Sequence, residues 1–457
     1  MTGRRLSFPV GLGLCVAVGA VVRIWYVLAV RSQHPVIGDA YFYHHAANLL
    51  ADGRGWIVPL DFLEHGQVNE AADHPPAYIA YLALWSLAGI RSETGHLLAT
   101  ALLGAAGVGF VGLVGRRVAG RAAGGTVGLV AAGLAAVNPN MWGWDGMGLS
   151  EPTAVIGVCL VLLAAWRLRD DPTPVSAALL GAAVGVAGLC RAELLLLGPL
   201  LAVPALWRPL AGGLARRLAL VAVAGIAAAV VVAPWVAHNL SRFEEPVYLS
   251  SGLDVTLAYS NCDPVFYGPL TGYWDFGCAP AALERSGQDT SGLDQSQRSL
   301  VWREEVERYV GDNLDRLPEV VLARIGRVAG LYKPLQQVRL DVIPEGREVW
   351  VARSGMAFYY GLAAVSFVGW TVLGRRGRWR YPLLLPLLVV ALAAATTFGA
   401  TRYRAAAEPA LCVLAAVGLV ALASLWARLR TPDAPVGDAP ELAVSDGAGP
   451  GPAAPTR

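Results

Sequence analysis

Residues 8–41, FPVGLGLCVAVGAVVRIWYVLAVRSQHPVIGDAY, place a long apolar run directly before an isolated acid, Asp39. A membrane-spanning helix needs about 20 apolar residues, so we expect residues 8–30 to cross a membrane. No small-residue cleavage site follows, which favours a retained span over a signal peptide. Nothing nearby in the sequence neutralises Asp39. It therefore either caps the helix expected after it or takes part in chemistry at the membrane surface.

The composition indicates a polytopic membrane protein. Of 457 residues, 55% are hydrophobic and 15% are charged, which is too little charge for a soluble protein of this length. The net charge of +2 gives no indication of a nucleic-acid partner. All basic residues except Lys333 are arginine, and with the high Ala and Gly content this suggests a GC-rich, actinobacterial type of genome.

The apolar runs predict an all-α protein with about ten or more transmembrane helices. Residues 77–115 are too long for one simple helix, and the number of crossings there stays open. We expect a short helix at 76–90, either packed at the outer surface or partly inserted, followed by one full crossing. The predicted spans are 8–30, 77–115, 124–141, 150–166, 174–190, 192–207, 218–238, 354–374, 381–399 and 406–427.

Arginine clusters predict the orientation of these spans, because short cytoplasmic loops collect positive charge. With the clusters inside, every segment of unusual polarity falls on the outer face. Ordinary loops are polar too, but the pair Arg402 and Arg404 on the outer side breaks the positive-inside bias. The outer segments are 31–76, 142–149, 191–193, 239–353 and 401–404.

Four regions follow from this arrangement. Residues 1–238 form an N-terminal transmembrane core that includes the outer loop 31–76, with juxtamembrane helices. Residues 239–353 form a larger extracytoplasmic region, and residues 354–430 return to the membrane. The tail 431–457 lacks an apolar period and is predicted to be a disordered cytoplasmic segment.

Two amphipathic helices are expected in the large outer region. Residues 296–316 show a helical pattern with Glu304 and Arg308 spaced to pair. Residues 319–333 carry an apolar side, with Arg324 and Arg327 lying away from it. The second helix either lies on the membrane surface or packs on the protein.

The six cysteines divide into two groups. Cys262 and Cys278 lie in the outer loop, where a disulfide can persist, and we favour a bridge between them over two free thiols. The others lie in apolar runs and are expected to be inert. We expect no zinc site, because no second Cys pair or His pair stands at ligand spacing.

The order of several short motifs resembles the GT-C glycosyltransferases, specifically the bacterial family-39 group related to protein O-mannosyltransferases and lipid A aminoarabinose transferases. The resemblance covers about residues 8–427. The matching stretches are Gly38-Asp39-Ala40-Tyr41, Asn48-Leu49-Leu50, Gly53-Arg54-Gly55, His74-Pro75-Pro76, Asn138-Pro139, Ser150-Glu151-Pro152, Arg191-Ala192-Glu193, Pro234-Trp235, Asn239, Pro246-Val247, Asn261-Cys262, Arg402-Tyr403-Arg404 and Glu408-Pro409.

The resemblance implies an inverting transfer of a sugar from a polyprenyl-phosphate donor in the outer leaflet to an acceptor hydroxyl on a cell-envelope glycan, lipid or protein. Asp39 would be the catalytic base. Arg402, Arg404 and Arg191 would hold the donor phosphate, with Glu193 as structural partner of Arg191. The auxiliary or acceptor-side candidates are Asp73, His74, Asp145 and Glu151.

Each of these assignments has a structural alternative. The arginine pair can anchor the last spans at the interface, Asp73 and His74 can simply end a loop, and Asp145 or Glu151 can cap a helix. If the catalytic assignment holds, at least one guanidinium should lie about 6–12 Å from the Asp39 carboxylate, with a sugar between them.

Three further questions stay open from the sequence. Asp39 is a possible ligand for Mg²⁺ or Mn²⁺, although Ala40 stands where many family members have a second acid. Arg23, inside the first span, needs an acidic partner. The competing functions are a multispan transporter or lipid flippase, disfavoured by the absence of an internal repeat, and a non-catalytic subunit of a cell-envelope assembly complex.

Overall fold

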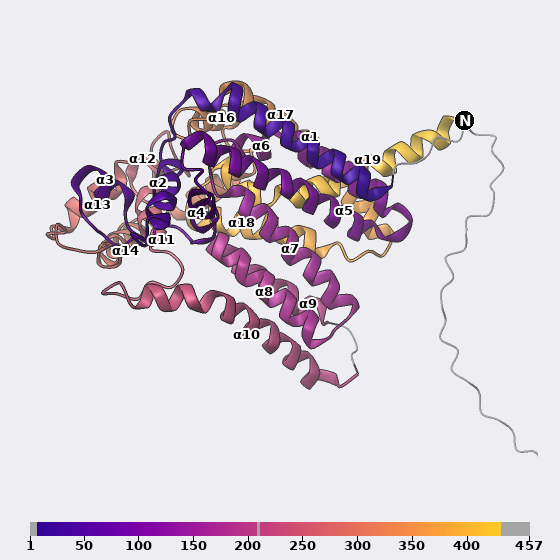
Figure 1. The fold of residues 1–457 in the computed structure, drawn as a ribbon, viewed down its shortest axis with the longest axis horizontal. Coiled ribbons are helices and arrows are strands. Elements are labelled where there is room, and N and C mark those ends of the chain that lie inside the picture. Colours follow the sequence, from indigo (N-terminus) through magenta and orange to yellow (C-terminus); the bar gives the residue numbers. More distant parts are fainter. Residues whose placement is uncertain (1–6, 208–210, 431–457) are drawn as a thin grey trace, which may run out of the picture.

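The fold is all-α, as the sequence predicts. A computed structural model describes residues 7–207 and 211–430, and these form helices joined by loops (Figure 1). The predicted disordered tail, 431–457, lies outside the described residues.

Long apolar helices form the body of the protein. Within the described ranges, six are long and apolar enough to cross a membrane, so the chain is a multi-pass membrane protein. They are α1 Phe8–Ala29, α5 Glu93–Val137, α7 Glu151–Asp170, α10 Gly213–Leu240, α17 Val349–Arg375 and α19 Glu408–Arg430. The shorter apolar helices are α4 Ala77–Leu87, α8 Pro174–Cys190, α9 Leu197–Ala205 and α18 Leu385–Thr396.

Helix α5 is a hairpin of two arms rather than one straight rod. Gly120 interrupts it with φ +73° and ψ −173°, a conformation that glycine adopts without steric cost. The arms then pack backbone to backbone, since a Cβ added to Gly128 would lie 2.7 Å from the carbonyl oxygen of Gly112. The stretch 77–137 therefore contains short α4, a break at 88–92 and the two arms, in agreement with the predicted spans.

The remaining helices belong to the two loop regions. Figure 1 shows α2, α3, α11, α12, α13 and α14 gathered at one end of the membrane helices. The first loop region and its neighbour contribute α2 Asp39–Ala51, α3 Pro59–His65 and α6 Pro139–Asp145. The large region contributes α11 Gly252–Ser260, α12 Asp263–Phe266, α13 Cys278–Ser286, α14 Gln295–Asp312, α15 Leu317–Val328 and α16 Pro334–Val342.

Helix α15 packs on the protein, the second of the two expected alternatives, and its arginines face inward. Arg324 and Arg327 are fully buried, whereas Leu322 is 70% exposed. The Arg324 guanidinium donates to the carbonyl oxygens of Ser260 and Ala395. Backbone carbonyls at the ends of α11 and α18 thus decide which face of α15 is buried, and the side-chain pattern of α15 does not reveal them. In α14, Arg308 pairs with Glu305 and not with Glu304.

Small residues let α17 and α19 approach closely. A Cβ added to Gly369 would lie 1.9 Å from the carbonyl oxygen of Leu414, so only glycine fits at this crossing, as is common between membrane helices. This contact packs the N-terminal half of α19 against the C-terminal half of α17.

Candidate functional site

The guanidinium of Arg402 is the centre of the candidate site. Its Nη1 lies 2.8 Å from Oδ2 of Asp39 and 3.6 Å from Oε2 of Glu345. Its Nε donates to Oε1 of Glu151 at 2.5 Å. Three carboxylates from distant parts of the chain therefore surround one arginine, and the cluster carries excess negative charge.

Helix starts and tight turns position these groups. Asp39 is the first residue of α2 and follows Gly38, whose φ of +55° turns the chain into the helix. Its carboxylate makes no hydrogen bond to the helix backbone within the described residues, so the structure gives no sign of a capping role. Arg402 lies in the 3₁₀ turn η4, Thr401–Ala406, which Thr401 fastens by donating to Asp341 at 2.6 Å.

A second arginine extends the cluster. Nη1 of Arg191 lies 3.5 Å from Oε1 of Glu151, and its Nε donates to Glu193 at 2.6 Å. Glu151, the first residue of α7, is 1% exposed, and its Oε2 is buried without a hydrogen-bond partner. Arg191 and Arg402 thus both contact Glu151, so the structure brings together three of the predicted site residues with Asp39.

Glu345 was missed by the sequence analysis. It lies in the loop between α16 and α17, which Gly346 turns with φ +73° and which Arg347 fastens to the carbonyl oxygen of Pro139. Tyr273 donates to Oε1 of Glu345 at 3.5 Å. An acid beside a glycine just before a span was the available signal, but such acids are common in loops.

The environment drives the two carboxylates in opposite directions. Burial alone would raise the pKa of Asp39, but the positive charge of Arg402, with His74 and Arg191, holds the pKa below its ordinary value. Burial raises the pKa of Glu345 to about 7, against the pull of Arg402 and with the help of the Asp39 charge. Arg402 thus favours the ionised form of Asp39, whereas burial favours the protonated form of Glu345.

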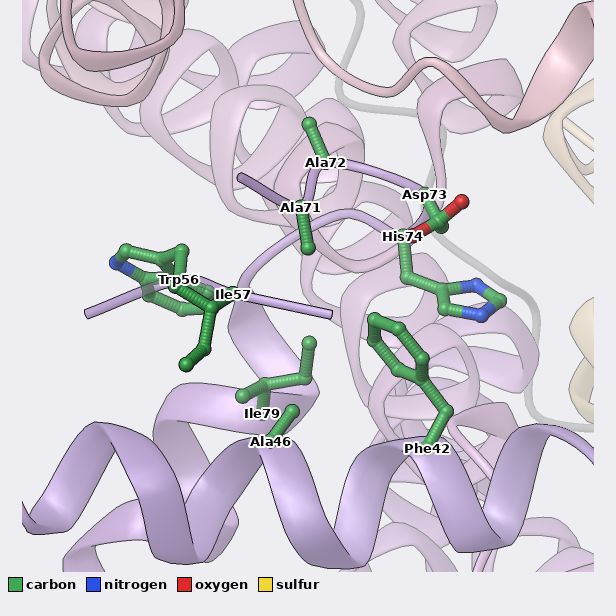
Figure 2. A pocket seen from close by; sticks show the side chains of 9 residues that line it. All are labelled: Phe42, Ala46, Trp56, Ile57, Ala71, Ala72, Asp73, His74 and Ile79. Atoms are coloured by element: carbon green, nitrogen blue, oxygen red, sulfur yellow. The ribbon is translucent and has the colours of Figure 1, made fainter. Parts of the chain in front are cut away.

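His74 joins the site from the other side of Asp39. Its Nε2 lies 3.9 Å from Oδ1 of Asp39, and its Nδ1 lies 3.3 Å from the hydroxyl of Tyr43. Figure 2 shows His74, Asp73 and Phe42 on one side of a small hollow whose other lining residues are alanines, isoleucines and a tryptophan. The hollow has a volume of about 10 Å³, enough for little more than one water molecule, so it is not the sugar site.

Three predicted residues lie apart from this cluster. Asp145 is buried in an ion pair with Arg23, 2.6 Å between Oδ2 and Nε, which supplies the partner that Arg23 was expected to need. Arg404 is buried and donates to Glu408 at 3.0 Å. Asp73 accepts from Gln295 at 2.7 Å. Each of these charged groups has a structural partner, so we do not carry them into the proposed mechanism.

The separation of Asp39 and Arg402 differs from the expected 6–12 Å, because the two groups are in direct contact. Opposite charges attract strongly where little water screens them, and the Arg402 side chain is only 14% exposed. A sugar between these groups requires the ion pair to open. The contact nevertheless puts both residues at the same end of the bundle.

A divalent cation does not fit the arrangement around Asp39, because the guanidinium of Arg402 already occupies the position between the carboxylates. The structure therefore gives no support for the Mg²⁺ or Mn²⁺ that the sequence left open at Asp39, and the proposed transfer uses no metal step.

The predicted disulfide is confirmed. Cys262 and Cys278 are bonded, with their Cα atoms 5.9 Å apart, within the usual range. The bridge closes the loop that carries Tyr273, the residue that contacts Glu345. It therefore helps to position the outer wall of the site.

Comparisons with known proteins identify the fold. No protein-family model matches the chain, and neither does any curated protein. The structure is similar to the oligosaccharyltransferase of Archaeoglobus fulgidus in the apo form, at 14% identity and a TM-score of 0.50, over 94% of this chain and 52% of that one. ArnT from Cupriavidus metallidurans, bound to undecaprenyl phosphate, aligns at 16% identity and a TM-score of 0.38, over 92% and 79%.

The chain spans about half the length of the archaeal oligosaccharyltransferase that it matches. At this level of identity the likeness shows the fold alone. It confirms the GT-C fold that the sequence motifs suggested.

Proposed function

We propose, from the GT-C fold and the cluster around Arg402, that this chain is a glycosyltransferase of the cell membrane. It would move a hexosyl or pentosyl group from a polyprenyl-phosphate donor to an acceptor hydroxyl on the extracytoplasmic side. The observation that carries the proposal is the contact of Asp39 with Arg402, which Glu151 links to Arg191. A base beside two phosphate-binding cations is what such a transfer needs.

The transfer would proceed as a single displacement. The acceptor hydroxyl donates a hydrogen bond to Asp39, and its oxygen attacks the anomeric carbon as the proton passes to the carboxylate. The bond from that carbon to the phosphate oxygen breaks on the opposite face. Polyprenyl phosphate leaves with the electron pair, and the anomeric configuration inverts.

The arginines would stabilise the departing phosphate. Nη2 of Arg402 and Nη2 of Arg191 donate no hydrogen bond within the described part of the chain. These donors are available to phosphate oxygens while Nε of each arginine stays bound to a glutamate. As phosphate approaches, Nη1 of Arg402 would exchange Asp39 for the donor, which frees Asp39 for the acceptor.

Glu345 would act as the acid, while Asp39 acts as the base. Two neighbouring carboxyl groups whose pKa values move apart are suited to act as acid and base. In its protonated form, Glu345 would donate a hydrogen bond to the leaving phosphate. His74, 3.9 Å from Asp39, would orient the acceptor.

Charge supports an extracytoplasmic location for this site. Helices α7, α17 and α19 all begin at the site end and finish with arginines. If those arginines mark the cytoplasmic side, the site lies outside, where lipid-linked donors and cell-envelope acceptors would meet it.

Purified protein incubated with a panel of radiolabelled polyprenyl-phosphate sugars tests the function. A glycosyltransferase releases polyprenyl phosphate in proportion to label transferred to an acceptor, and the Asp39→Asn variant does not. A flippase would move the labelled lipid across a vesicle with the sugar bond intact, and a non-catalytic subunit would do neither. Either of those results would overturn the proposal.

A further inference from the structure

A second cluster of polar side chains lies on a different face of α2. His44, His45 and Glu93 each place one potential ligand atom within 4.8 Å of the others. The histidines come from α2, and Glu93 is the first residue of α5. Asp39 and Tyr43 face His74 and Arg402 instead, so this cluster is separate from the site around Arg402.

The cluster is chemically suited to a cation. Imidazole nitrogens and carboxylate oxygens are both atoms that bind divalent transition metals. Unlike the site carboxylates, Glu93 has no ion-pair partner among residues 7–207 and 211–430. Its Oε2 accepts only a long hydrogen bond, 3.4 Å, from the backbone of Val36.

A supporting network holds the His44 ring from behind. Nδ1 of His44 lies 3.0 Å from Nδ1 of His96, and Nε2 of His96 lies 3.0 Å from the hydroxyl of Ser86. Ser86 in turn donates to Asn48 at 2.9 Å. In the tautomer in which His44 donates from Nδ1, its Nε2 keeps the lone pair; there it has only a 3.4 Å contact with Asn48. Metal-bound histidines are commonly oriented by such a second hydrogen bond.

We propose that His44, His45 and Glu93 bind one divalent transition-metal ion of the zinc type. Two imidazoles and one carboxylate are a ligand set that zinc accepts, with the fourth position left to water. Mg²⁺ and Mn²⁺ would favour a site richer in oxygen. The ion would fasten α2 to the start of α5, one turn from Asp39, and so fix the direction of the catalytic carboxylate.

The test measures metal binding and needs no catalytic activity. The full chain, purified in detergent with a tag that lacks histidine, is treated with chelator and then titrated with Zn²⁺. Co²⁺ serves as a spectroscopic probe, because tetrahedral Co²⁺ absorbs strongly in the visible. The variants Glu93→Gln and His45→Gln each remove one ligand at a partly exposed position. His65→Gln, an exposed histidine of the same outer region, is the control.

We expect one Zn²⁺ per chain, a visible Co²⁺ spectrum, and a rise in thermal midpoint on adding Zn²⁺ to wild type and to His65→Gln. Both ligand variants should bind Zn²⁺ at least about tenfold more weakly and show no such rise. Equal binding by all four proteins, or no binding by wild type, would overturn the proposal. In that case the histidines form only the hydrogen-bonded network with Ser86.

Discussion

Arg402 and Asp39 form an ion pair, with Nη1 2.8 Å from Oδ2, that joins the turn before the last span to the first residue of α2. The same guanidinium binds Glu151 and approaches Glu345. One side chain thus connects four segments of the chain, and its removal should affect the donor site as a whole.

Arg402→Lys keeps the positive charge but loses the planar guanidinium, which can donate hydrogen bonds to several oxygens at once. We expect the apparent affinity for a polyprenyl-phosphate donor to fall about tenfold or more, since each hydrogen bond to a charged group contributes about 1.5–3 kcal/mol. Donor titration against the variant measures this. Arg339→Lys, an exposed arginine on α16, should bind like wild type, and equal affinity of the two variants would remove Arg402 from the donor site.

The pH profile of kcat/KM reports on Glu345. Its pKa of about 7 means that the protonated fraction falls as pH rises through 7. If the protonated form donates to phosphate, kcat/KM should decline above about pH 7. Glu345→Gln cannot ionise, so its activity should be lower but flat across that range. If kcat/KM of Glu345→Gln still declines above about pH 7 as in wild type, the decline is caused by the titration of another group.

Arg404→Met should destabilise the protein without acting on the donor directly. The substitution leaves Glu408 as a buried charge without its partner, which costs about 3–5 kcal/mol. Thermal unfolding should show a lower midpoint, and the double variant Arg404→Met/Glu408→Gln should recover part of it. If the single variant instead unfolds like wild type but loses donor binding, the phosphate role predicted from sequence is restored.

The Cys262–Cys278 bridge should hold the loop that carries Tyr273. A closed loop of this size stabilises by about 3 kcal/mol in the chain-entropy account. Replacing both cysteines by serine should therefore speed hydrogen exchange across residues 262–278 and reduce transfer. Cys15→Ser, a thiol outside this loop, is the control. Exchange that is unchanged in the double variant would show that packing alone holds the loop.

Much of the fold could be predicted, because membrane spans can be recognised in a sequence from long apolar runs and from the charge of the loops between them. Even the division of residues 77–137 followed from length. The inward face of α15 could not be predicted, since Arg324 binds carbonyl groups of other segments that no local pattern reveals.

The candidate site likewise contains residues that could be predicted from the sequence and residues that could not. Asp39, Glu151, Arg191 and Arg402 stood out as polar residues at the ends of spans, and the structure brings them together. Arg404 had the same appearance, but its partner four residues later, Glu408, turns it into the interior. Glu345 carried too weak a signal, because only the folded chain places it beside Arg402.

The central claim is that the Asp39 carboxylate activates the acceptor, and the turnover of Asp39→Asn under saturating donor tests it most directly. The amide keeps the shape and loses the basicity, so turnover should fall by about two to four powers of ten while donor binding persists. Asp52→Asn, an exposed acid at the other end of α2, should turn over like wild type. Near-normal turnover in Asp39→Asn would contradict the account.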